Sequence, residues 1–268
     1  MKYILLFLCI LSLSCKYNVA NPVGALKDYT EGSGIIYYVS SSASVSEIEE
    51  ALRKNKHSLG KYKIIVTNGS DTTTNILNSI SNALKNNTSF NPVEVDISKL
   101  EITEIPEGVF KGLGNLSSIM LSDKVQKIGK EAFSGCSSLN NIRFSKGLTN
   151  IGNGAFSNCV SLTFASLDSE EKLTISSNAF SGCSSLVNLV LPKSITKVEG
   201  DAFKNCSQLK NVEYLGTTNV SGTNVFSSPN PTNLYLPNVT NGSKTSFTNF
   251  LGNSWSSSNI HTNKHIPN

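Results

Sequence analysis

The chain has 268 residues, of which 38% are hydrophobic, so it can bury a core in one elongated domain or two small ones. Only 16% of the residues are charged, and the formal net charge of +4 is too small and too dispersed to indicate nucleic-acid binding. No run of basic residues interleaves with aromatic residues, which argues further against a nucleic-acid partner.

Residues 1–14 have the pattern of a signal peptide. Lys2 supplies a positive charge, and an apolar run from Tyr3 to Leu13 follows it. This run is shorter than the ~20 residues that a membrane-spanning helix needs. We therefore expect residues 1–14 to be removed when the protein is secreted.

The end of the apolar run, Leu11-Ser12-Leu13-Ser14-Cys15, resembles a bacterial lipobox. The resemblance implies cleavage before Cys15 and a lipid on Cys15, which would be the chain's only link to the membrane. Ser12 departs from the usual lipobox, which prefers leucine there, although spirochaete lipoboxes resemble this looser pattern. The alternative is an ordinary secretory signal with an incidental cysteine. Residues 15–33 have little periodicity and are expected to form a lipidated tether.

Residues 34–92 are expected to form a small α/β N-terminal cap, with a third strand leading out of it. Strands are predicted at 35–39, 62–66 and 93–97, and helices at 45–56 and 72–86. Ser44 and Glu47 have the spacing of a capping box, and Asn68-Gly69 is predicted to end the second strand. This β-α-β-α-β segment would close the open end of the following repeats, or alternatively bind a partner of its own.

Residues 93–237 contain a repeat that decides the fold class. Six phenylalanines follow one another at separations of 23, 23, 24, 23 and 23 residues, and four cysteines stand three residues after a phenylalanine. The repeat core is Phe110, Phe133, Phe156, Phe180 and Phe203, with Cys136, Cys159, Cys183 and Cys206, and Phe226 marks a sixth unit. A period in the twenties lies in the leucine-rich-repeat range, where each coil buries its apolar columns against its neighbours. The sequence therefore predicts an α/β repeat protein, a leucine-rich-repeat solenoid of about six 23-residue coils behind the cap.

Two coils depart from the pattern. The coil that ends at Phe180 has the small Ala165 in a strand column and one extra residue, so we expect a local bulge there. The coil around Phe226 is degraded, but a one-residue deletion returns Leu234 and Leu236 to the strand columns. A degraded last coil is expected because it has no neighbour to stack on.

The unit from Ile128 to Phe144, Ile-Gly-Lys-Glu-Ala-Phe-Ser-Gly-Cys-Ser-Ser-Leu-Asn-Asn-Ile-Arg-Phe, resembles a known repeat. It is similar to the BspA-like, or Treponema pallidum-type, leucine-rich-repeat family, whose unit reads roughly I-x-x-x-A-F-x-x-C-x-x-L-x-x-I-x-L-P. The resemblance covers residues 94–237. It implies a surface lipoprotein of the outer membrane that binds or adheres to host or extracellular-matrix proteins. The alternative is an envelope structural or antigenic spacer with no dedicated ligand.

The remaining chemistry does not indicate an enzyme. The repeat cysteines stand one per coil, so they do not converge on a metal ion, and we expect them to be buried, reduced and structural. His57 lies at the end of a predicted helix, and His261 and His265 lie in residues 238–268, an expected polar C-terminal cap or tail. No catalytic motif is present, and no catalytic residue, metal or cofactor is predicted.

The outward positions of the repeat strands form the candidate ligand face. Positions eight and ten after each phenylalanine should face solvent because their neighbours at nine and eleven face the core. These positions are Ser118, Met120, Asn141, Arg143, Phe164, Ser166, Asn188, Val190, Asn211 and Glu213. A row of apolar residues among amides would suit protein recognition. The alternative is that these residues are spacers that face water.

Overall fold

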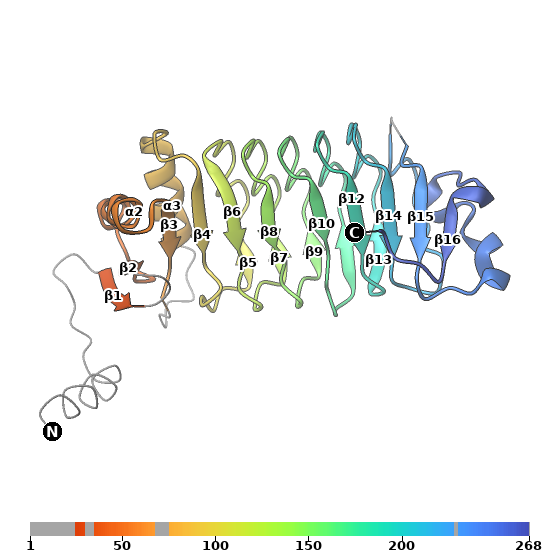
Figure 1. The fold of residues 1–268 in the computed structure, drawn as a ribbon, viewed down its shortest axis with the longest axis horizontal. Coiled ribbons are helices and arrows are strands. Elements are labelled where there is room, and N and C mark those ends of the chain that lie inside the picture. Colours follow the sequence, from red (N-terminus) through yellow and green to blue (C-terminus); the bar gives the residue numbers. More distant parts are fainter. Residues whose placement is uncertain (1–24, 30–34, 68–74, 228–229, 268) are drawn as a thin grey trace, which may run out of the picture.

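The computed structural model describes residues 25–29, 35–67, 75–227 and 230–267. The predicted signal peptide, Cys15, the turn at Asn68-Gly69 and the start of the second predicted helix lie outside these ranges. Figure 1 shows an elongated stack of coils with a cap at each end. Within the described ranges, no helix combines the length and apolar character needed to cross a bilayer.

The N-terminal cap has the predicted β-α-β-α-β order. Its elements are β2 (Ile35–Val39), α2 (Val45–Leu59), β3 (Tyr62–Ile65), α3 (Asn75–Asn86) and β4 (Val93–Asp96). The capping box is confirmed, since Ser44 and Glu47 each accept a hydrogen bond from the other's backbone N–H. Part of the expected tether forms β1 (Ala25–Tyr29), which pairs antiparallel with β2. Because β4 pairs with β6 of the first coil, the sheet of the cap continues into the solenoid.

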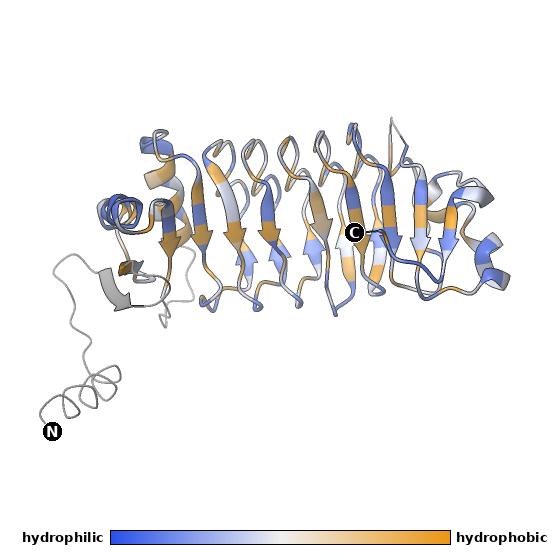
Figure 2. Cartoon of the chain, viewed as in Figure 1, coloured by the Kyte–Doolittle hydropathy of each residue, from blue (hydrophilic) through white to orange (hydrophobic). Residues whose placement is uncertain are grey.

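Parallel strands run along two sides of the solenoid, which confirms the predicted leucine-rich-repeat fold. The first side carries β6 (Leu116–Met120), β8 (Asn141–Arg143), β10 (Phe164–Ser166), β12 (Asn188–Leu191), β14 (Asn211–Tyr214) and β15 (Asn233–Leu236). The second side carries β5 (Glu104–Ile105), β7 (Lys127–Ile128), β9 (Asn150–Ile151), β11 (Leu173–Ile175) and β13 (Ile195–Val198). Hydrophobic and hydrophilic bands alternate along these strands in Figure 2, as expected for strands with one buried side.

The six repeat phenylalanines form one internal stack. Neighbouring ring centroids are 5.0–5.7 Å apart, and the ring planes are inclined by 4–26°. Each repeat cysteine is buried beside the stack and donates its thiol to a phenylalanine carbonyl of the preceding coil, as Cys136 does to Phe110 at 3.1 Å. The stack and the thiols together give each coil the same contacts with its neighbours.

Left-handed backbone conformations explain two further columns of the repeat. The position two residues after each of five phenylalanines has a positive φ and holds only glycine or asparagine: Gly112, Gly135, Asn158, Gly182 and Asn205. The position two residues before each phenylalanine also has a positive φ, with Glu131 at 52° as the strained exception among glycine, asparagine and aspartate. These residue types tolerate that conformation best, so the turn geometry selects them.

The strand ladder on the first side is interrupted between β8 and β10, which belong to separate sheets. Phe144 occupies a strand column that holds leucine in most coils, and its ring packs edge-on against Phe156 and Phe180 at 5.5 and 6.4 Å. This bulk is consistent with the small Ala165 in the next coil. The bulge predicted for this coil is also found, as a register shift between Leu173 and Thr174 in the pairing of β11 with β13.

Residues 238–262 form a folded C-terminal cap with an aromatic interior. It contains the 3₁₀ helices η1 (Asn241–Phe247), η2 (Phe250–Gly252) and η3 (Ser257–Asn259), followed by β16 (Ile260–Thr262). Phe247, Phe250 and Trp255 are buried, and Trp255 packs edge-on against Phe226 at the end of the phenylalanine stack. Strand β16 pairs in parallel with β15, so His261 lies in a strand rather than in the expected polar tail.

Candidate functional site

The predicted ligand residues lie on one solvent-facing surface, which we call the outer sheet face: the outward side of β6, β8, β10, β12, β14 and β15. Phe164 and Met120 are its most exposed apolar residues, with 50% and 39% of their surface accessible. Asn141 and Arg143 are exposed, and Ser118, Ser166, Asn188, Val190 and Asn211 are partly buried. Glu213 differs from this set because only 5% of its surface is accessible.

A recess opens on the outer sheet face where the strand ladder is interrupted. The β8–β10 recess has a volume of about 290 Å³ and is lined by residues 140–144, Lys146, Phe164, Ser166 and Asp168. Its apolar wall consists of Ile142, Phe144 and Phe164. The half-exposed ring of Phe164 therefore lies beside a recess on the predicted ligand face.

Charged side chains surround the recess in opposed pairs. The guanidinium of Arg143 lies 3.2 Å from both carboxylate oxygens of Asp123. The Nζ of Lys146 lies 3.2 Å from a carboxylate oxygen of Glu170. All four side chains are about half exposed or more, so each ion pair contributes little stability and can exchange partners at low cost.

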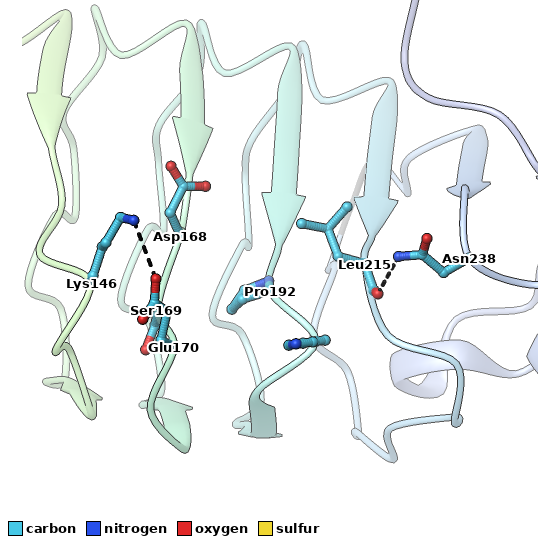
Figure 3. Close-up of a pocket in the computed structure, with 8 residues that line it drawn as sticks. Lys146, Asp168, Ser169, Glu170, Pro192, Leu215 and Asn238 are labelled. Atoms are coloured by element: carbon cyan, nitrogen blue, oxygen red, sulfur yellow. Dashed lines mark hydrogen bonds and ion pairs between the residues drawn. The ribbon is translucent and has the colours of Figure 1, made fainter.

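A second recess continues along the ends of the strands. It has a volume of about 370 Å³ and shares Lys146 and Asp168 with the β8–β10 recess. Figure 3 shows its residues on successive coils, with Glu170 near Lys146 and Asn238 donating to the carbonyl of Leu215 at 2.7 Å. The two recesses are therefore neighbours, one on the outer sheet face and the other at the strand ends.

Asparagines form a hydrogen-bonded row across β12, β14 and β15. The amide of Asn211 donates to Asn188 at 2.8 Å, and the amide of Asn233 donates to Asn211 at 2.9 Å. The ring of His261 lies 3.4 Å from Asn233 and stacks on Tyr235 at 4.7 Å. Burial, reinforced by nearby Lys264 and Lys244, lowers the pKa of His261 below 6.5. These hydrogen bonds fix the orientation of the amides on the part of the outer sheet face between Phe164 and the C-terminal cap.

The C-terminal segment, residues 263–267, accounts for the burial of Glu213. One carboxylate oxygen lies 2.6 Å from Nδ1 of His265, and the other accepts the backbone N–H of Ile266 at 2.8 Å. The sequence predicts that the side chain of Glu213 is accessible to a ligand, and this prediction is wrong because the segment covers it. The cause is a contact across 52 residues of sequence, which the repeat pattern does not contain.

The two recesses are lined by amides, exposed charges and aromatic rings, which are groups suited to binding. Among the described residues, no three His, Cys, Asp or Glu side chains gather in a way that would hold a metal ion. Burial raises the pKa of Cys136 and Cys206 to about 12, and that of Cys159 and Cys183 also rises. These thiols remain protonated at neutral pH and are poor nucleophiles.

The sequence did not predict several residues of the two recesses and of the asparagine row. Lys146 and Lys193 each stand two residues after the last strand column of a coil, and Asn233 pairs in register with Asn211. Extending the alignment by two columns, and through the degraded coil, would have found them. Lys193 is exposed and lines the second recess, and it makes no hydrogen bond or ion pair with the described part of the chain.

Comparisons with known proteins agree with this architecture. Residues 55–174, 103–233 and 173–265 match the family described as "BspA type Leucine rich repeat region", with six copies. A solved leucine rich cell surface protein from Faecalibacterium prausnitzii A2-165 is similar, with 32% identity over 47% of this chain and 33% of that one, and a TM-score of 0.44.

Two further solved structures are similar to the chain. The T. pallidum Leucine Rich Repeat protein has 27% identity over 61% of this chain and 85% of its own, with a TM-score of 0.45. A leucine-rich repeat protein from Bacteroides ovatus ATCC 8483 has 22% identity over 53% of this chain and 60% of its own, with a TM-score of 0.26. This chain spans only about a third of the Faecalibacterium protein. No curated protein matches the chain.

Proposed function

Because the chain belongs to the BspA-type leucine-rich-repeat family, we propose that it is a protein-binding module whose ligand contacts the outer sheet face. The observation that carries this proposal is the half-exposed ring of Phe164 beside the β8–β10 recess. Aromatic residues and arginine are enriched where protein interfaces concentrate their affinity, and Phe164 and Arg143 both line this recess.

The open form of the β8–β10 recess favours a protein ligand over a small molecule, because small-molecule pockets typically enclose most of the surface of their ligand. The recess is open to solvent on the sheet surface and is apolar on only part of its wall. Such a hollow suits one or two side chains of a partner, with Asn141 and Asn188 available for hydrogen bonds beside it.

Binding to immobilised extracellular-matrix proteins tests the proposal. Phe164→Ala and Arg143→Ala should each weaken binding about 30-fold, the loss that corresponds to a ~2 kcal/mol hot spot. Val160→Ala and Arg53→Ala are matched controls, since Val160 and Arg53 are also exposed but line neither recess. If the two recess variants bind as well as the controls, the outer sheet face is not the ligand face, and the structural or antigenic spacer becomes the better explanation.

We also propose that the protein is held at the bacterial surface by a lipid on Cys15 and adheres there to host components. The lipobox-like sequence supports the anchor. Radiolabelled fatty acid should be incorporated into the wild-type chain and into Cys9→Ala, but not into Cys15→Ala. Brief protease treatment of intact cells should remove the protein. Its complete survival would place it away from the outer surface.

A further inference from the structure

The buried carboxylate of Glu213 lies at a position that is partly or fully exposed in the four preceding coils, where it is occupied by Met120, Arg143, Ser166 and Val190. In the next coil the equivalent residue, Tyr235, is also buried, and the ring of His261 stacks on it. The cover over Glu213 is different, because it is the C-terminal segment, residues 263–267. Figure 1 shows this segment turning back from β16 across the strands.

The contacts between Glu213 and the segment satisfy a carboxylate that would otherwise be exposed. Both of its oxygens are occupied, one by the imidazole of His265 and one by the backbone N–H of Ile266. These two donors replace the water that the carboxylate loses beneath the segment, so its burial is not costly. Displacing the segment would return Glu213 to water, as at the outward positions of the preceding coils.

The segment itself is held lightly. The side chain of His265 is 71% exposed, and Asn263, Lys264 and Pro267 are exposed as well. Its other backbone anchor is the N–H of Asn263, which donates to the carbonyl of Leu236 at 3.0 Å. Few buried apolar contacts and an exposed backbone are the features of segments that open locally at low free energy.

We propose that the outer sheet face over β14 is a docking surface for an extended peptide segment bearing a basic side chain, and that residues 263–267 are its resident, displaceable occupant. Charge complementarity supports this choice of occupant, because the surface offers the acidic Glu213 and the segment carries Lys264 and His265. This inference rests on the proposed ligand face and extends it. With the segment displaced, a partner could contact the surface from Phe164, along the asparagine row, to Glu213.

The covalent connection of residues 263–267 to β16 sets how strongly a competing ligand must bind. A short linker holds the segment at an effective concentration of the order of millimolar, so a competitor needs a dissociation constant well below that value. The same reasoning predicts that the free segment binds an emptied surface weakly but measurably. Extra contacts with Phe164 or the asparagine row would let a true partner displace it.

A truncated chain that ends at Thr262 tests the proposal with a defined probe. The probe is a fluorescent peptide with the sequence of residues 263–267, Asn-Lys-His-Ile-Pro, and its matched control has alanine in place of histidine. The probe should bind the truncated chain at least tenfold more tightly than the complete chain, and Glu213→Ala in the truncated chain should abolish binding. No binding to a folded truncated chain at several millimolar peptide, or equal binding to both chains, would overturn the proposal.

Amide hydrogen exchange in the complete chain gives a second test that does not depend on the truncation folding. The Ile266 amide should be protected in the wild-type protein, and Glu213→Ala or His265→Ala should lower its protection at least tenfold. His57→Ala is the control and should leave it unchanged. An unprotected Ile266 amide in the wild-type chain would refute docking. None of these measurements uses Phe164 or Arg143, so failure here is distinguishable from failure of the ligand face itself.

Discussion

Phe156→Ala removes the central ring of the phenylalanine stack. The Phe156 ring lies between Phe133 and Phe180 at centroid distances of 5.0 and 5.1 Å, and Phe144 packs against it edge-on at 5.5 Å. It is fully buried. Replacing a buried phenylalanine with alanine costs ~3–5 kcal/mol, and this range already includes its aromatic contacts, which are worth ~0.5–1.5 kcal/mol each. Because Phe156 has three ring partners, we expect the free energy of unfolding to fall by ~4–5 kcal/mol, at the upper end of that range.

Equilibrium denaturation in urea measures this change, because a fall in the midpoint at constant slope reports a loss of stability. Phe164→Ala is the matched control, since it deletes the same atoms from a ring that is 50% exposed. It should cost less than about 1 kcal/mol, as surface substitutions generally do. Equal effects of the two substitutions would refute the idea that the stack holds the coils together. A lower slope for Phe156→Ala alone would show that the two halves of the solenoid unfold separately.

Three further changes follow from the structure. Ser44→Ala removes the capping box of α2 and should destabilise the protein by ~1 kcal/mol in thermal denaturation, whereas Ser42→Ala, at a neighbouring exposed serine, should change it little. The repeat cysteines should resist iodoacetamide at pH 8 in the folded chain and react after unfolding, because burial raises their pKa; mass spectrometry that finds Cys159 alkylated in the folded chain would contradict this. The unfolded chain binds a proton at His261 more readily than the folded chain does, because the pKa of His261 is lowered in the folded chain. The contribution of His261 to stability is therefore complete above pH 6.5 and is lost as the pH falls below that value. NMR titration of the His261 ring should give a pKa below 6.5, and His261→Asn should make stability depend less on pH in this range.

The repeat could be predicted from sequence because each coil repeats the same demands on its residues. Phe133, Cys136 and Ile142 recur at fixed offsets, and recurrence at a fixed period is what stacked coils require. The helix start at Ser44 could also be predicted, because a capping box is a local interaction. These features depend on neighbours in sequence or on the period, both of which a single chain displays.

Other features depend on contacts that no local pattern records. The aromatic residues of the C-terminal cap, such as Phe247 and Trp255, lie on short 3₁₀ helices without a regular period, so their burial was not predicted. The cover over Glu213 comes from a residue 52 positions away. The β8–β10 recess lies where the bulky Phe144 of one coil meets the small Ala165 of the next. Ala165 departs visibly from the repeat pattern, whereas the packing of Phe144 depends on rings in two other coils.

The near-identical geometry of the interior coils has an evolutionary consequence. Rings from Phe133 to Phe203 stack at 5.0–5.1 Å, so each coil offers its neighbours the same surface on both sides. A gene duplication or deletion of one 23-residue unit within this region would leave both caps intact and preserve the stacking of the phenylalanine rings. The protein could therefore change its reach in steps of one strand spacing, ~4.8 Å, by unequal recombination. A unit gained or lost between β10 and β14 would alter the distance between Phe164 and Glu213 without requiring a new fold.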